Sequence, residues 1–75
     1  MTKVYCYNEP IWDGHTVVGN DVVELTEREV LESPWAKYWM TQMLEKYGEG
    51  HPLISKETCL EDFVAVNWAW IREEP

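Results

Sequence analysis

The chain has 75 residues, with 14 Asp and Glu against six Lys and Arg, and its formal net charge is -8. This length is enough for one small domain, which we expect to span residues 1–75, and too short for two. The negative charge argues against direct binding to nucleic acid or to membranes, and it favours a partner protein with a basic surface.

The first predicted element is a short strand in KVYCYN, residues 3–8, where β-forming residues dominate. Alternation would divide its side chains between two faces, with Val4, Cys6 and Asn8 on one and Tyr5 and Tyr7 on the other. Pro10 is expected to end the strand, and the favoured turn pair Asp13-Gly14 follows it.

A hairpin is predicted in HTVVGNDVVEL, residues 15–25. Gly19-Asn20 lies between two Val-Val runs, and glycine accepts the positive φ that a two-residue turn requires. In that register Val17 would lie opposite Val22. The Val-Val runs do not indicate which face of the hairpin is buried.

Two helices are predicted next. Thr26 and Glu29 form a capping box, and Ser33-Pro34 begins a second helix with Gly48 as its C-terminal cap. The second helix would bury one apolar stripe, made of Trp35, Ala36, Trp39, Met40, Met43, Leu44 and Tyr47.

The C-terminal segment, residues 63–72, fits either a helix or a strand. A capping-box pattern at residues 58–61 favours the helix, on which Trp68 joins the core and Trp70 points away from it. On a strand, both tryptophans would face the same side. The whole pattern predicts a small α+β domain, in which a β-hairpin, with or without a third strand, packs against two or three helices.

Metal and catalytic sites are not expected. Cys6, His15, His51 and Cys59 are sufficient in number for tetrahedral zinc, but their spacing fits no familiar zinc motif. Neither a nucleophile elbow nor a phosphate-binding loop is present. We therefore predict no enzymatic activity and no cofactor. Two cysteines and no apolar leader in MTKVYCYNEP predict a reduced, cytoplasmic protein without a membrane span.

The candidate partner-binding residues are two tryptophans outside the predicted core, Trp12 and Trp70, and three acidic residues, Glu24, Glu27 and Glu32. Carboxylates that share a face would attract a basic protein or imitate the phosphates of a nucleic acid. An alternative is that they form ordinary i, i+4 pairs, Glu24 with Arg28 and Arg28 with Glu32. A homodimer sealed by Trp12 or Trp70 is a further possibility.

The segments WDGHTVVGNDVVELTE and CLEDFVAVNWAW resemble short acidic proteins encoded by tailed bacteriophages. The resemblance covers about half of the chain and includes no motif of known function, so it assigns no site residue. It implies an accessory protein or inhibitor that binds and redirects a host protein, in some cases by imitating nucleic acid. This chain differs from dedicated nucleic-acid mimics, which are more acidic and contain less tryptophan.

Overall fold

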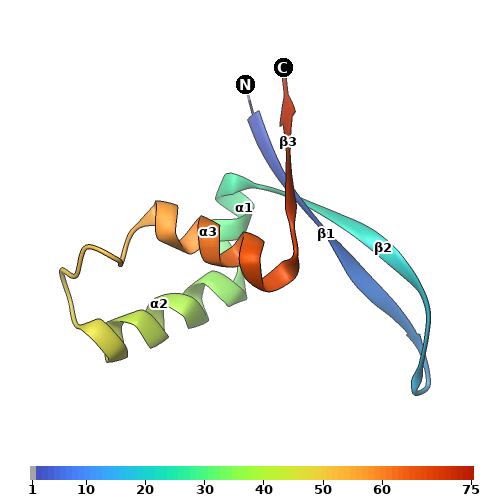
Figure 1. Ribbon diagram of the computed structural model, residues 1–75, viewed down its shortest axis with the longest axis horizontal. Coiled ribbons are helices and arrows are strands. Elements are labelled where there is room, and N and C mark those ends of the chain that lie inside the picture. The colour runs from blue at the N-terminus through green and yellow to red at the C-terminus, as the bar shows by residue number, and fades with distance from the viewer. Residues whose placement is uncertain (1) are drawn as a thin grey trace.

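The computed structural model describes residues 2–75, and Figure 1 shows their arrangement. Three strands and three helices follow one another as β1 (Thr2–Asp13), β2 (Thr16–Thr26), α1 (Glu27–Glu32), α2 (Pro34–Tyr47), α3 (Lys56–Asn67) and β3 (Trp70–Glu74). The strands form one antiparallel sheet in the order β2-β1-β3. The predicted α+β class is confirmed, and the third strand is present.

The hairpin turn lies five residues earlier than the sequence predicted. Asp13 pairs with Thr16 around a turn in which Gly14 has φ 65°, whereas Gly19 lies inside β2, opposite Ile11. The predicted Gly19-Asn20 turn, and with it the pairing of Val17 and Val22, was therefore wrong. Both glycines could supply a positive φ, but a turn at Gly14 lets β1 pair with β2 from Val4 to Asp13.

Pro10 does not end β1, which continues to Asp13. Proline lacks a backbone N–H and is tolerated in strands mainly where one edge is free. That condition holds here, because β3 pairs only with residues 2–6 of β1 and leaves the rest of that edge open. A register shift between Ile11 and Trp12 then leaves Val18 as the extra residue of a β-bulge in β2.

The predicted caps of α1 and α2 are confirmed. The Thr26 hydroxyl accepts from the Glu29 backbone N–H at 3.2 Å, and the Glu29 carboxylate accepts from the Thr26 backbone N–H at 3.0 Å. This bonding lowers the pKa of Glu29. Ser33 caps α2 with Pro34 as its first residue, and the helix ends at Gly48, whose φ is 84°.

The segment after residue 55 contains a helix and then a strand. Ser55, rather than Thr58, is the N-cap of α3, because the Ser55 hydroxyl accepts from the Thr58 backbone N–H at 3.2 Å. The helix ends at Trp68, which has the left-handed φ of 53°, and β3 begins at Trp70. Trp68 is 90% exposed, so its predicted place in the core was wrong. The reversal of the chain turns its side chain away from the apolar face of α3.

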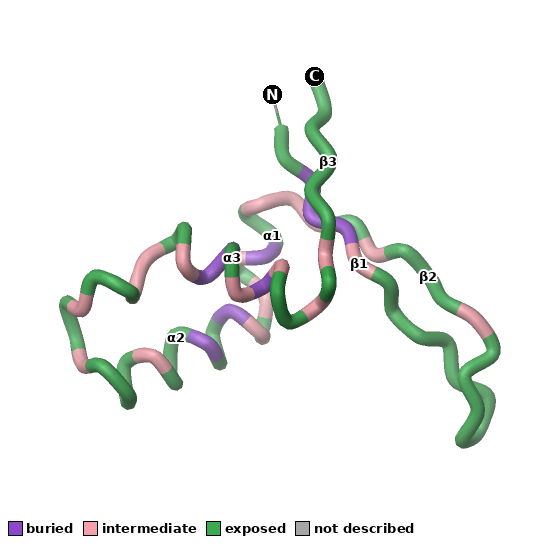
Figure 2. Tube along the Cα trace, in the orientation of Figure 1, coloured by how far each residue is buried: buried purple, intermediate pink, exposed green. Residues whose placement is uncertain are grey.

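The core lies between the sheet and the helices, where Figure 2 shows the buried segments. Phe63 is at its centre and makes edge-to-face contacts with three aromatic rings, those of Tyr5, Tyr7 and Trp35, at centroid distances of 6.3, 5.7 and 5.4 Å. Trp39 belongs to a second buried cluster and donates from Nε1 to the Asp62 carboxylate at 2.6 Å, which ties α2 to α3. The predicted stripe on α2 is buried only in its first half, and Met40, Leu44 and Tyr47 are exposed.

Candidate functional site

The sheet has one face against the helices and one face that no helix covers (Figure 1). Tyr5 and Tyr7 lie on the inner face, where they contact Phe63. Because side chains alternate along a strand, Val4 and Cys6 lie on the opposite, outer face. The predicted division of these residues between two faces is therefore confirmed.

An ion pair covers the part of the outer face that lies nearest the helices, around Val4 and Cys6; we call this part the proximal outer face. Arg72 of β3 lies opposite Val4, and Glu24 of β2 lies opposite Cys6, so both long side chains project from the outer face. The Arg72 guanidinium donates to both Glu24 carboxylate oxygens, at 3.1 and 2.9 Å, and so crosses the central strand. Val4 and Cys6 are buried beneath it. These hydrogen bonds and the adjacent positive charge lower the pKa of Glu24.

The distal hairpin, residues 8–22, extends away from the helices and from β3 (Figures 1 and 2). Its exposed apolar side chains are Ile11, Trp12, Val17, Val18 and Val22, and Trp12 is 61% exposed. An uncovered antiparallel face usually carries polar side chains. This apolar composition marks the distal hairpin as a candidate binding surface.

The charge of the distal hairpin is entirely acidic. Residues 8–22 contain Glu9, Asp13 and Asp21, one histidine, and no Lys or Arg. Glu9 and Asp21 lie directly opposite each other, an arrangement that destabilises a sheet unless a cation lies nearby. Because side chains alternate along a strand, Trp12, Val17 and Val22 project on the outer face, whereas Glu9, Asp13 and Asp21 project on the opposite face of the same hairpin. The apolar and the acidic groups therefore lie on two faces of one hairpin that has no Lys or Arg.

Three of the five predicted site residues lie on the outer face. Trp70 and Glu24 flank Cys6 from the two neighbouring strands, and Trp12 is six residues further along β1, about 20 Å away. Trp70 is 44% exposed. The sequence did not identify the valines of the distal hairpin, although the absence of Lys and Arg around them was a signal that could have done so.

The three predicted acidic residues are each held by a basic residue. Glu24 binds Arg72 and not Arg28, so the predicted Glu24–Arg28 pair is wrong. The predicted Arg28–Glu32 pair is present at 3.0 Å. Glu27 lies in α1 and pairs with Lys56 at 2.6 Å, a contact that raises the pKa of Lys56.

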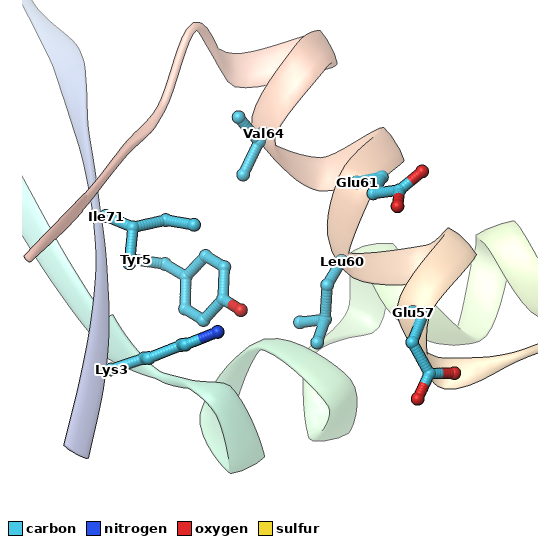
Figure 3. Close-up of a pocket in the computed structure, with 7 residues that line it drawn as sticks. All are labelled: Lys3, Tyr5, Glu57, Leu60, Glu61, Val64 and Ile71. Carbon is cyan, nitrogen blue, oxygen red and sulfur yellow. The ribbon is translucent and has the colours of Figure 1, made fainter. Parts of the chain in front are cut away.

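A groove opens on the inner side of the sheet, between α3 and strands β1 and β3 (Figure 3). Its volume is about 360 Å³, and it is lined by Lys3, Tyr5, Glu57, Leu60, Glu61, Val64 and Ile71. Figure 3 shows the side chains of Leu60 and Val64 directed toward Tyr5 and Ile71 across the groove. The groove is thus apolar at its base and has carboxylates on α3.

Residues 2–75 bring together no group of three or more His, Cys, Asp and Glu that could hold a metal ion. Cys6 and Cys59 are buried free thiols in β1 and α3, whereas His15 lies in the hairpin turn and His51 between α2 and α3. Within the same range, no helix has the length and hydrophobicity needed to cross a bilayer. Comparison with protein-family models, curated proteins and solved structures gave no match.

Proposed function

We propose that this chain is a non-enzymatic protein-binding domain, and that the distal hairpin binds a partner protein whose surface is basic and partly apolar. The outer face of the hairpin would supply the apolar contacts, and its opposite face the acidic ones. The observation that carries the proposal is the distal hairpin itself. It exposes Trp12 and four aliphatic side chains in a segment with three acidic residues and no Lys or Arg. Tryptophan is a common anchor at protein interfaces, and complementary charge speeds the encounter of two proteins.

The shape of the chain also supports a binding role. A compact monomer of 8.9 kDa exposes about 4,800 Å², whereas this chain exposes 5649 Å². The excess, about 800 Å², equals the area that one partner contributes to an interface of standard size. The radius of gyration is 14.5 Å, against about 11 Å for a compact chain of this length.

The charge favours a different protein over a second copy. Residues 8–22 contain Glu9, Asp13 and Asp21 but no Lys or Arg, so two copies of the hairpin would have like charges and lack the opposite charge that a basic partner supplies. Imitation of nucleic acid remains an alternative prediction. It has less support, because Glu24, Glu27 and Glu32 are each paired with a basic residue of the chain itself.

The test is affinity capture with three immobilised forms of the protein. Because the sequence resembles short acidic phage proteins, we further propose that the domain is a phage accessory protein or inhibitor, and the lysate should be bacterial. We expect a basic protein to bind the wild type and Tyr38→Ser, an exposed control on α2, but not Trp12→Ser. The purified complex should weaken as ionic strength rises above about 0.1 M.

Three results would contradict this proposal. Equal capture by all three forms would remove Trp12 from the interface. An affinity that does not change with salt would remove the electrostatic contribution. A dimer at micromolar concentration that Trp12→Ser dissociates, measured by sedimentation velocity, would assign the surface to a second copy instead.

A further inference from the structure

β3 is an edge strand, and the edge that faces away from β1 has no neighbouring strand. In the sheet order β2-β1-β3 it has β1 as its one neighbour, and all five of its residues are exposed. Edge strands present unpaired backbone N–H and C=O groups, to which an extended segment of another protein can add as a further strand. No register shift interrupts the pairing of β3 with β1, so the edge is regular over its length.

The groove reaches this edge through Ile71. Its apolar walls come from Leu60 and Val64 of α3 and from Ile71 of β3. A volume of about 360 Å³ is at the lower end of the range for ligand pockets, roughly 300 to 1,000 Å³, and leaves room for an apolar side chain. A strand added beside β3 would direct every second side chain toward this inner face.

Tyr5 gives the groove a polar group as well. The residue is 3% exposed and lines the groove, and Figure 3 shows its hydroxyl directed into the space beside Leu60. Among residues 2–75, none of the side-chain hydrogen bonds that hold the fold involves this hydroxyl. A tyrosine hydroxyl is protonated at neutral pH, and burial raises the pKa of Tyr5 further, so this hydroxyl can donate to a backbone or side-chain oxygen of an incoming segment.

The charges around the groove favour basic residues in the added strand. Glu57 and Glu61 are one helical turn apart on α3, are exposed, and form no ion pair within residues 2–75. Lys3 is the basic residue of the groove. Arg72, the basic residue of β3, is already held by Glu24 and Glu74.

We infer that the free edge of β3, the edge away from β1, pairs with an extended segment of a partner protein. An apolar side chain of that segment enters the groove, and Lys or Arg two residues before and after it contacts Glu57 and Glu61. The inference goes beyond the proposed function, because the groove lies on the side of the sheet opposite the outer face. It does not depend on the distal hairpin.

The test uses a synthetic peptide and the whole protein. The probe is the acetylated amide Thr-Lys-Thr-Leu-Thr-Lys-Thr, in which Leu and both Lys share one face of a strand. In a titration of ¹⁵N-labelled protein, we expect saturable amide shifts in residues 70–74, at Leu60 and at Val64, with a dissociation constant in the millimolar range. Trp12→Ser should bind the peptide as the wild type does.

Three matched peptides separate the parts of the inference. Replacing Leu by Ser removes the apolar contact, replacing both Lys by Gln removes the charge, and N-methylation of alternate residues removes the backbone pairing. Each change should weaken binding about tenfold or more. Undiminished binding of the N-methylated peptide would overturn strand addition, and undiminished binding of the Gln peptide would overturn the role of charge.

Protein variants complete the test. The double variant Glu57→Gln, Glu61→Gln should weaken binding of the Lys peptide and leave binding of the Gln peptide unchanged. Glu45→Gln with Glu49→Gln makes the same change of charge outside the groove and should leave both affinities unchanged. Equal weakening by the two double variants would mean that net charge, and not the groove, attracts the peptide. That result, or an absence of saturable shifts, would overturn the inference.

Discussion

The two ends of β1 have opposite environments although they belong to one continuous strand. At Val4, Tyr5 and Cys6, β1 has a strand on each side, helices on one face and the Arg72–Glu24 ion pair on the other. At Ile11 and Trp12 it has β2 alone, and both side chains are exposed.

Local sequence favours a strand at residues 3–8 and argues against one at residues 8–13, where Pro10 lies, yet β1 includes both. What differs is the number of neighbours that the rest of the chain supplies. The end of β1 at residues 4–6 belongs to the core, and the end at residues 11–12 is exposed to solvent. Substitutions in the core should therefore destabilise the fold far more than substitutions in the distal hairpin.

Phe63→Ala should cost about 3 to 5 kcal/mol of unfolding free energy, because it removes the ring on which Tyr5, Tyr7 and Trp35 converge. A domain of this size has about the same total stability, so we expect a largely unfolded chain. Circular dichroism with urea denaturation measures the loss. The control is Val66→Ala on the exposed side of α3, and a cooperative transition near that of the wild type in Phe63→Ala would place the core elsewhere.

Trp39→Phe should cost about 1.5 to 3 kcal/mol, because it removes the N–H that Asp62 accepts and leaves a partly buried carboxylate without its donor. The same denaturation experiment applies, with Trp70→Phe as the control on the sheet. A double-mutant cycle with Asp62→Ala isolates the bond. A coupling energy of zero would show that the two side chains do not interact in solution.

Local signals were sufficient where a local interaction decides the structure. The capping box at Thr26 and Glu29, Ser33-Pro34 and Gly48 were predicted correctly because a cap depends on residues within one turn. Ser55 and Thr58 are both local candidates for the N-cap of α3, and the sequence interpretation chose the later one. Gly14 and Gly19 could each form a turn, and the choice between them depends on strand pairing over many residues.

The candidate site was predicted only in part, because local sequence identifies single residues but not the contacts between distant ones. Trp12 and Trp70 were identified as tryptophans outside the helical stripe, and both lie on the outer face. The end of α3 at Trp68 could not be predicted, because a left-handed tryptophan is stabilised only if β3 then pairs with β1. The partner of Glu24 was missed because Arg72 is 48 residues away in the sequence.

Arg72→Gln should uncover the proximal outer face without unfolding the core. Cys6 is 0% exposed beneath the ion pair, so its alkylation by iodoacetamide should become several-fold faster. Peptide mass spectrometry distinguishes Cys6 from Cys59, which should stay slow because burial, and then the charge of Asp62, raise its thiol pKa. Arg28→Gln is the matched change of charge, and equal labelling of Cys6 in both variants would contradict the covering role.

Lowering the pH should break the Arg72–Glu24 ion pair. Arg72 holds the pKa of Glu24 below its ordinary value of 4.5, so the folded state binds this proton less tightly than the unfolded chain. The contribution of Glu24 to stability is therefore present above about pH 4.5 and is lost as pH falls further. Urea midpoints measured from pH 6 to about pH 3 should decline less in Glu24→Gln than in the wild type. If the urea midpoints of the wild type and Glu24→Gln declined in parallel as pH falls, the ion pair would add nothing to stability.

Trp12→Ala should have the smallest effect on folding, although it removes a larger side chain than Phe63→Ala does. Trp12 lies where β1 has β2 alone and is 61% exposed, so we expect the unfolding free energy to change by less than about 0.5 kcal/mol. Urea denaturation measures this change under the conditions used for Phe63→Ala. A loss comparable with that of Phe63→Ala would mean that the ring packs within the chain in solution, and the distal hairpin would then have no free surface to offer a partner. A negligible loss would show that the ring of Trp12 does not hold the fold together, as its proposed contact with a partner requires.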